Sequence, residues 1–314
     1  MLVVRFGGGL GNQLFQYAFL LMLKQQNPDN DIICDTTTYQ FFNEHNGFDL
    51  KEYFEFNERE LDISELKRFK PVFYYQIKSG RKIKSLKAYN KILLQEKFLY
   101  QLRKRTRNLG YLCIEDHGNL MYNPGAIGKF GGKDCYFEGG WQSRYYYDFR
   151  YLNKAIRFKD IQLNNQEKNL ERDILYSNSV AVHVRRGDFV QNKSCFDLCS
   201  MEYYQKAIDE VVTKSGLKKD ELKFFMFSDD ESYVKSTFDL PNMVIVKGQS
   251  AGNEMYLMSN AKYNITANST FSFWAAMLNR KPELAVIPKY FVRSGGLLYK
   301  FDAPDGWCSV DNLI

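Results

Sequence analysis

Residues 179–188, Ser-Val-Ala-Val-His-Val-Arg-Arg-Gly-Asp, are the strongest indication of the fold class, because an apolar run typical of a buried strand ends there in charged residues. Similar runs recur further along the chain, separated by amphipathic stretches. Strands are expected at 180–184, 222–227, 243–246, 263–266 and 284–287, and helices at 200–214, 231–237, 253–261 and 269–278. Because parallel strands need crossover connections, this alternation predicts a Rossmann-like domain with a parallel sheet covered on both faces.

A second α/β region begins the chain. We expect a strand at 2–6, a glycine turn at Gly7-Gly-Gly-Leu-Gly-Asn12, a helix at 13–26 and a strand at 32–35, which together make a βαβ unit. The stretch 41–150 is irregular, with only loose helical spacing near 83–97. The polar run at 164–169 places the boundary between 152 and 178, so we expect domains at 1–160 and 161–314.

Polar residues follow four of the predicted strands. The carboxyl ends of parallel strands meet at one edge of a sheet, and open sheets of this kind bind ligands there. We therefore expect one binding edge built from His183-Val-Arg185-Arg186-Gly-Asp188, Ser228-Asp229-Asp230, Lys247-Gly248-Gln249 and Ala267-Asn268-Ser269-Thr270.

Each group at this edge has a functional and a structural interpretation. Two adjacent arginines leaving a strand favour a bound anion such as phosphate, and the alternative is ion pairing with Asp188 and a surface carboxylate. Ser269 and Thr270 begin a helix, which fits a phosphate site or an ordinary N-cap. Asp229 and Asp230 would accept hydrogen bonds from a guanine or ribose, or cap the next helix.

The basic residues are concentrated in one segment. The chain has a net charge of +6, which is too small to argue for a nucleic-acid partner. Residues 78–107 hold eleven basic side chains and the single acid Glu96. This segment is interpreted as a solvated helix face, with peripheral contact to anionic membrane as the alternative.

Other features bear on location and metal binding. The chain starts without a charged leader, and its longest apolar run, 18–23, is far too short to span a bilayer, so we expect a cytoplasmic protein, alternatively peripheral on the inner face of the membrane. The six cysteines are then expected to be free thiols. Only Cys195 and Cys199 are closely spaced, and no complete zinc ligand set is present.

Several blocks of the sequence resemble one known family. The blocks at 8–18 (Gly-Gly-Leu-Gly-Asn-Gln-Leu-Phe-Gln-Tyr-Ala), 182–189 (Val-His-Val-Arg-Arg-Gly-Asp-Phe) and 267–276 (Ala-Asn-Ser-Thr-Phe-Ser-Phe-Trp-Ala-Ala) are similar to hallmark blocks of bacterial α-1,2-fucosyltransferases of glycosyltransferase family 11. A fourth block, 137–143, departs from the family pattern at Glu138-Gly-Gly-Trp141, and Phe189 stands where many relatives have Tyr.

The resemblance implies a GT-B-like enzyme with two Rossmann-like domains facing a cleft. The C-terminal domain would bind GDP-β-L-fucose, and the N-terminal domain would lie on the acceptor side. Fucose would pass with inversion to the 2-hydroxyl of a terminal galactose in an oligosaccharide or lipid-linked glycan, without a metal or another cofactor. Alternatives are another linkage, or a non-catalytic nucleotide- or polyanion-binding protein.

The resemblance also implies roles for individual residues. Arg185 would grip the β-phosphate, supported by Arg186, and His183 with Asp229 or Asp230 would seat the guanosine. The other substrate-binding positions would be Asn268, Ser269 and Thr270 at the pyrophosphate, and Gly9, Asn12 and Gln13 across the cleft. For the general base the sequence offers three carboxylates, Asp188, Glu138 and Asp35 in order of preference.

Overall fold

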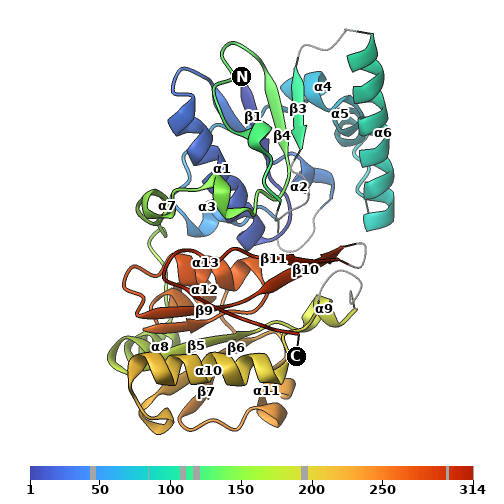
Figure 1. Ribbon diagram of the computed structural model, residues 1–314. Helices are drawn as coiled ribbons and strands as arrows, with labels where there is room; N and C mark the ends of the chain where they lie inside the picture. Colours follow the sequence, from blue (N-terminus) through green and yellow to red (C-terminus); the bar gives the residue numbers. More distant parts are fainter. Residues whose placement is uncertain are drawn as a thin grey trace. The chain divides into compact units, whose positions relative to one another are not determined.

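The computed structural model describes residues 1–42, 47–83, 85–106, 111–115, 121–191, 197–294 and 297–313. The chain divides into two compact units (Figure 1). Unit 1 comprises residues 1–52 and 56–148, and unit 2 comprises residues 53–55 and 149–314. Each unit contains its own parallel sheet, which confirms the α/β fold class with two Rossmann-like units.

Unit 1 is built on a four-stranded sheet with the order β2-β1-β4-β3, in which all neighbouring strands are parallel. The expected βαβ unit forms its first half. The elements are β1 (Leu2–Arg5), α1 (Leu10–Gln26), β2 (Ile32–Asp35), α2 (Thr38–Phe41), α3 (Leu50–Tyr53), α4 (Ile63–Phe69), α5 (Pro71–Lys78), α6 (Leu86–Arg105), β3 (Leu112–Glu115), η1 (Pro124–Ala126), β4 (Cys135–Glu138) and η2 (Arg144–Tyr146).

Unit 2 is built on a six-stranded parallel sheet with the order β7-β6-β5-β8-β9-β12. This is the strand order of a doubly wound Rossmann sheet. The elements are α7 (Phe149–Ala155), α8 (Asn165–Tyr176), β5 (Ser179–Val184), α9 (Gly187–Gln191), α10 (Met201–Ser215), η3 (Lys219–Glu221), β6 (Lys223–Ser228), α11 (Glu231–Thr237), β7 (Met243–Ile245), α12 (Ala251–Ser259), β8 (Tyr263–Ile265), α13 (Thr270–Met277), β9 (Leu284–Pro288), β10 (Tyr290–Ser294), β11 (Leu297–Lys300) and β12 (Cys308–Val310).

Helix α10 shows how the local sequence anchors the centre of unit 2. The Ser200 side chain caps it by accepting a hydrogen bond from the Tyr203 N–H (3.1 Å), and Gly216 ends it in the left-handed conformation. The hydroxyls of Tyr203 and Tyr204 donate to the carbonyl oxygens of Thr266 (2.5 Å) and His183 (3.1 Å). The helix thereby fixes the carboxyl ends of β8 and β5.

The stretch 41–150 contains more regular structure than its sequence pattern indicates. Strands β3 and β4 complete the sheet of unit 1, and α6 is a continuous helix. These elements are hard to recognise because β3 and β4 are each four residues long and β3 is exposed at both ends. The strands β10, β11 and β12 were likewise not expected from the sequence.

The unit boundary lies at residues 148 and 149, earlier than the expected 160 and 161. Helix α7 belongs to unit 2 because the Asn153 side chain donates to the carbonyl oxygen of Met277 (2.6 Å). Residues 53–55 join unit 2 as well, since Phe54 stacks on Phe158 with ring centroids 4.6 Å apart.

None of the helices in the described ranges is both long enough and apolar enough to cross a lipid bilayer.

Candidate functional site

The candidate site lies at the carboxyl edge of the unit 2 sheet. Strands β5 and β8 are neighbours there, although β6 and β7 continue the sheet on one side and β9 and β12 on the other. Such a reversal of strand order opens a crevice where Rossmann sheets bind ligands. His183 lies near the carboxyl end of β5 itself, and the segments that follow β5, β6 and β8 hold Arg185, Asp229 and Ser269.

Arg185 and Asp229 form an ion pair at this edge. Arg185 Nη1 lies 2.8 Å from Asp229 Oδ2, and the Arg185 and Asp229 side chains are 29% and 27% exposed. The second carboxylate oxygen of Asp229 accepts the main-chain N–H of Arg186 (2.9 Å). A Cβ at Gly187 would come within 2.6 Å of Asp229 Oδ2, which explains the glycine at this position. Asp229 thus fixes Arg185 at the surface of the edge.

Arg186 has a different environment from Arg185. Its Nε donates to Asp230 Oδ2 (3.0 Å), and its guanidinium carbon lies 3.6 Å from the centre of the Tyr233 ring. Asp230 also caps α11, because it accepts the N–H of Tyr233 (3.0 Å). The hydrogen bond from Tyr233 is the main cause of a lowered pKa at Asp230, and the hydrogen bond from Arg186 adds to it. Arg186 and Asp230 therefore stabilise the start of α11, and Asp230 has the helix-capping role that the sequence analysis gave as an alternative.

His183 is buried beside this pair of charges. Burial, and to a smaller extent the charge of Arg185, lowers the pKa of His183 to about 4, so its imidazole is neutral at pH 7. Its Nδ1 is buried and has no hydrogen-bond partner among the described residues. Its ring centroid lies 5.9 Å from that of Phe271 in α13. A neutral imidazole with an unused nitrogen suits a polar, uncharged group of a ligand.

Glu254 in α12 is influenced by the charges of Asp229 and Arg185, and the sequence analysis did not single it out. Burial raises its pKa to about 7, the charge of Asp229 adds to this effect, and the charge of Arg185 opposes it. Glu254 is therefore close enough to both residues to sense their charges. The available sequence signal was a glutamate close to the apolar residues Met255, Leu257 and Met258.

The residues after β8 divide into two groups. Asn268 is buried, and its Nδ2 donates to the carbonyl oxygens of Asp197 (2.7 Å) and Phe291 (3.3 Å), so it holds the surrounding loops. Ser269 and Thr270 are half-buried at the start of α13, and Ser269 makes no side-chain cap. Their hydroxyls and the N–H groups of the first turn are placed to meet an anion.

In the glycine-rich segment of unit 1, the polar side chains make hydrogen bonds to other parts of the same unit. Gly9 is the N-cap of α1, and Asn12 Oδ1 accepts a hydrogen bond from Gln142 Nε2 (3.1 Å). Gln13 is fully buried, donating to the carbonyl oxygens of Gly8 (2.9 Å) and Gly47 (2.7 Å) and accepting the N–H of Leu50 (3.0 Å). The side chain of Gln13 therefore holds two loops together.

Unit 1 also contains a cavity of about 270 Å³ at the carboxyl ends of β1 and β4. Gly7, Gly8 and Gly139 bring main chain to its wall. Aromatic and amide side chains share its lining: Tyr39, Phe42 and Tyr89, and Asn12, Gln16 and Gln142.

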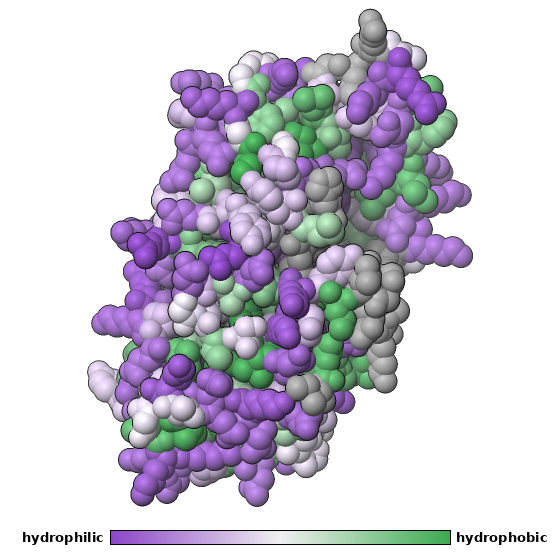
Figure 2. Space-filling view, in the orientation of Figure 1, coloured by the Kyte–Doolittle hydropathy of each residue, from purple (hydrophilic) through white to green (hydrophobic). Residues whose placement is uncertain are grey.

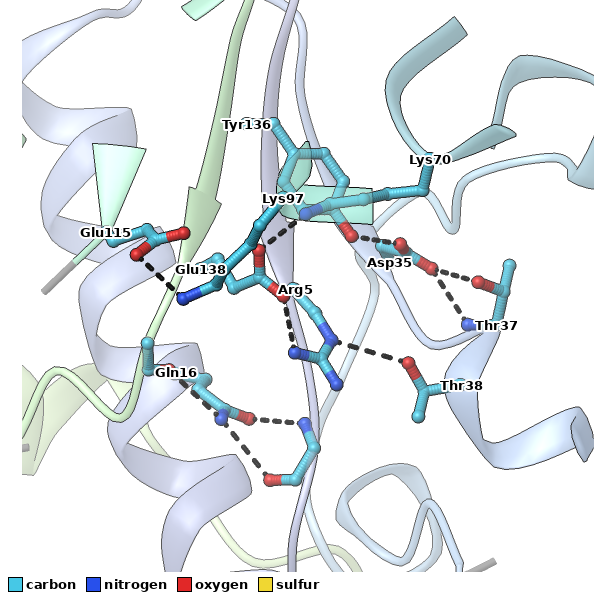
Figure 3. A network of polar contacts seen from close by, with 12 residues as sticks. Arg5, Gln16, Asp35, Thr37, Thr38, Lys70, Lys97, Glu115, Tyr136 and Glu138 are labelled. Atoms are coloured by element: carbon cyan, nitrogen blue, oxygen red, sulfur yellow. Dashed lines mark hydrogen bonds and ion pairs between the residues drawn. The ribbon is translucent and has the colours of Figure 1, made fainter. Parts of the chain in front are cut away.

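A buried ion network lies beside this cavity (Figure 3). Glu138 accepts from Arg5 Nη1 (2.7 Å) and from Lys70 Nζ (2.5 Å). Burial alone would raise the pKa of Glu138, but the charges of Lys70 and Arg5 outweigh it and lower the pKa to about 2. Asp35 accepts hydrogen bonds from the Tyr136 hydroxyl (2.5 Å) and from Thr37. Both carboxylates have structural partners, which removes the geometric basis for proposing either as the general base.

Asp188 remains the third base candidate. Its main chain belongs to α9, but its side chain lies outside the described part of the structure.

One group of three potential metal ligands occurs among the described residues, formed by Cys113, Glu115 and Glu138. Because Glu138 already pairs with two cations and Glu115 pairs with Lys97 (3.2 Å), this group is explained without a metal.

Residues 1–294 match the family model described as glycosyl transferase family 11. The chain belongs to glycosyl transferase family 11. The family expected from the sequence blocks is thus confirmed. Among curated proteins, an alpha-1,2-colitosyltransferase of Escherichia coli is 29% identical over 99% of both chains. The O-antigen biosynthesis glycosyltransferase WbnK of Escherichia coli is 27% identical over 89% of this chain and 91% of its own.

Solved structures with some similarity to this family 11 chain include two fucosyltransferases. The NodZ alpha-1,6-fucosyltransferase soaked with GDP-fucose has a TM-score of 0.49 and 13% identity, covering 88% of this chain and 91% of its own. POFUT1 in complex with GDP has a TM-score of 0.44 and 12% identity, covering 91% of this chain and 98% of its own.

Proposed function

We propose that this family 11 glycosyltransferase transfers L-fucose from GDP-β-L-fucose to the 2-hydroxyl of a terminal galactose. The observation that carries the proposal is the Arg185 guanidinium, fixed by Asp229 at the carboxyl edge of the unit 2 sheet. A guanidinium held in this way matches the oxygens of a diphosphate. The resemblance of the sequence blocks supplies the identity of the sugar.

The surrounding residues suit the other parts of a sugar nucleotide. Ser269 and Thr270, with the first turn of α13, offer hydroxyl and N–H donors for a second phosphate. Neutral His183 and the carboxyl of Glu254 suit a nucleobase, because guanine presents both donors and acceptors at its edge. Asn268, Arg186 and Asp230 would support this site through the contacts they make with neighbouring loops and with α11.

The reaction follows from the stereochemistry of donor and product. The acceptor oxygen forms a bond to C1 of the sugar as the bond from C1 to the phosphate oxygen breaks, so a β-linked donor gives an α-linked product. Negative charge grows on the departing GDP, and Arg185 is placed to stabilise it. One well-placed donor contributes about 3–4 kcal/mol to such a transition state. Arginine and N–H groups supply this charge stabilisation without assistance from a divalent cation.

The acceptor hydroxyl must lose its proton during the attack. Glu138 and Asp35 are held by structural partners, so Asp188, three residues after Arg185, is retained as the proposed base.

The unit 1 cavity is the proposed binding site for the acceptor sugar. A pyranose ring packs one face on aromatic side chains and hydrogen-bonds through its hydroxyls, and this cavity offers both kinds of partner. Tyr89 provides a specific contact, since its buried hydroxyl has no partner among the described residues and its ring is stacked on Phe42 with centroids 4.3 Å apart.

A second donor, GDP-colitose, is favoured by the curated colitosyltransferase that is 29% identical to this chain. Colitose is fucose without its 3-hydroxyl. A site that hydrogen-bonds this hydroxyl discriminates strongly against the deoxy sugar, whereas an apolar site does not.

The deciding experiment offers GDP-fucose and GDP-colitose separately, and then in competition, with lactose as acceptor. We expect trisaccharide from GDP-fucose, released GDP, a 1,2 linkage by NMR and no loss of activity with EDTA. Preference for GDP-colitose would show that the transferred sugar is colitose. A 1,3 or 1,6 product would show that the linkage differs from the proposed 1,2 linkage. Absence of both product and GDP release with either donor would favour the non-catalytic binding protein.

A further inference from the structure

Helix α6 carries an apolar row on the side that faces solvent. Leu94, Phe98 and Leu102 are 68%, 69% and 49% exposed. They follow one another at intervals of four residues, so they occupy an arc of about 80° on the helix surface. Figure 2 shows hydrophobic surface between hydrophilic side chains over α6, at the upper right of the view. Single exposed apolar residues are ordinary, but a row of three large ones is not.

The opposite side of α6 already packs against unit 1. Tyr89 and Glu96 are buried, and they lie about 160–180° around the helix from the centre of the apolar row. The Glu96 carboxylate accepts the main-chain N–H of Phe73 in α5 (2.8 Å). The apolar row is therefore additional to the face that folding requires.

Basic side chains share the arc with the apolar row. Lys87, Lys91 and Arg105 are all exposed and lie within the same arc of about 80° on the helix surface. Lys97 and Lys104 are exposed about 60° and 80° beyond one edge of this arc, and Lys97 pairs with Glu115 (3.2 Å). Glu96 is the only acid in residues 71–106, and its burial removes it from this surface. The basic segment 78–107 also includes Lys84 and Arg107, which lie outside the described residues.

A shallow groove continues the apolar surface toward α5. It has a volume of about 460 Å³ and is lined by Val72, Lys91, Leu94, Gln95, Phe98 and Leu99. Tyr75 in α5 is also largely exposed.

We propose that α6 docks this family 11 glycosyltransferase on an anionic lipid bilayer. The helix would lie in the plane of the interface, with Leu94, Phe98 and Leu102 below the headgroups and Lys87, Lys91 and Arg105 among the phosphates. Large apolar side chains combined with lysine and arginine are typical of interfacial helices. Charge complementarity selects the occupant, because the described α6 surface bears cations and a second copy would bring the same cations against them. The inference does not depend on the identity of the donor sugar.

The test is co-sedimentation of the full chain with vesicles of phosphatidylcholine alone or with added phosphatidylglycerol. We expect binding only with phosphatidylglycerol, weakening as salt is raised. The variant Lys87→Gln/Lys91→Gln/Arg105→Gln should bind about a hundredfold more weakly, because each cation near an anionic surface contributes about 1 kcal/mol. The variant Leu94→Ser/Phe98→Ser should lose about tenfold or more.

Matched variants in unit 2 provide the controls. Lys168→Gln/Lys206→Gln/Lys214→Gln removes three exposed lysines from α8 and α10, and Leu175→Ser/Tyr176→Ser removes two exposed apolar side chains from α8. Both should bind vesicles like the wild type. Circular dichroism melting of every variant verifies folding, and the charge variants test the proposal even if the serine variant does not fold.

Three outcomes would overturn the proposal. The first is equal wild-type binding to both kinds of vesicle, or to neither. The second is unchanged binding after the α6 charge substitutions. The third is a wild-type dimer, seen by light scattering, that becomes monomeric in Leu94→Ser/Phe98→Ser while vesicle binding is unaffected; this would assign the face to self-association.

Discussion

Arg185 and Asp229 are joined at the carboxyl edge of the unit 2 sheet by a contact of 2.8 Å between Nη1 and Oδ2. The other oxygen of Asp229 holds the main-chain N–H of Arg186, so one carboxylate orients the arginine and its backbone together. The guanidinium remains partly exposed. A phosphate would then meet a cation whose position is set before binding.

The first prediction concerns Asp229→Asn, which keeps the shape of the side chain but removes its charge. We expect the affinity for GDP to fall roughly tenfold, because Arg185 is no longer held in place. The melting temperature should change little, since a partly exposed ion pair contributes about 0–1 kcal/mol to stability. Calorimetric titration with GDP measures the first quantity. Unchanged GDP affinity would show that Asp229 does not position Arg185 for the nucleotide.

The second prediction concerns Glu138→Gln in the buried network of unit 1. The substitution leaves Arg5 and Lys70 without their shared carboxylate, and breaking a buried pair of this kind costs about 3–5 kcal/mol. Because the pKa of Glu138 is lowered from 4.5 to about 2, its stabilising effect is present above pH 4.5 and is lost as the pH falls toward 2. Urea unfolding at pH 7 and pH 3 should show a smaller difference between variant and wild type at pH 3. Normal stability with lost turnover would instead restore Glu138 as a candidate base.

The third prediction concerns Glu254, whose pKa is raised from 4.5 to about 7. A raised carboxyl pKa favours the folded state below pH 4.5, and this advantage is lost as the pH rises through 7. Glu254→Gln should therefore be more stable than the wild type at pH 8, by about 1–2 kcal/mol after allowance for partial solvent exposure, and the gap should close at pH 5. Urea unfolding at both pH values measures this, with Glu202→Gln on exposed α10 surface as the control. If the stability of Glu254→Gln and Glu202→Gln relative to the wild type depended on pH in the same way, the raised pKa of Glu254 would be contradicted.

The fourth prediction concerns Tyr89→Phe in the unit 1 cavity. The stacked ring is retained and a buried hydroxyl without a described partner is removed, so stability should be unchanged or slightly higher. If the hydroxyl binds the acceptor sugar, KM for lactose should rise about fivefold to tenfold with little change in kcat. Steady-state kinetics with varied lactose gives the answer. A reduced kcat at constant KM would place Tyr89 outside the acceptor site.

The fold of unit 2, and the gathering of polar residues at the carboxyl edge of its sheet, were largely predictable from the sequence. Its strands are continuous apolar runs, as expected for a sheet buried on both faces, and their carboxyl ends are marked by His183, Arg185 and Asp229. Glu254 was not predictable, because the two charges that act on it, those of Asp229 and Arg185, are distant from it in the sequence. The same reason applies to Asn268, whose partners Asp197 and Phe291 belong to other loops.

Unit 1 was less predictable. Its first βαβ unit is recognisable, but β3 and β4 are too short to give a periodic signal, and α6 has apolar residues on two faces. The resemblance placed Gln13 among the substrate-binding residues, and the sequence offered Glu138 as a candidate general base. The main-chain groups of Gly47 and Leu50 that hold Gln13, and the cations that hold Glu138, become apparent only in the folded structure.

Turnover of the Arg185→Ala variant shows whether Arg185 stabilises the departing GDP. The rate of GDP release from GDP-fucose and from GDP-colitose should be measured at saturating lactose, with thermal melting as the test of folding. We expect a fall in kcat of about 10²–10³ with the active donor and an unchanged melting temperature. A folded Arg185→Ala variant that turns over at close to the wild-type rate would contradict this expectation.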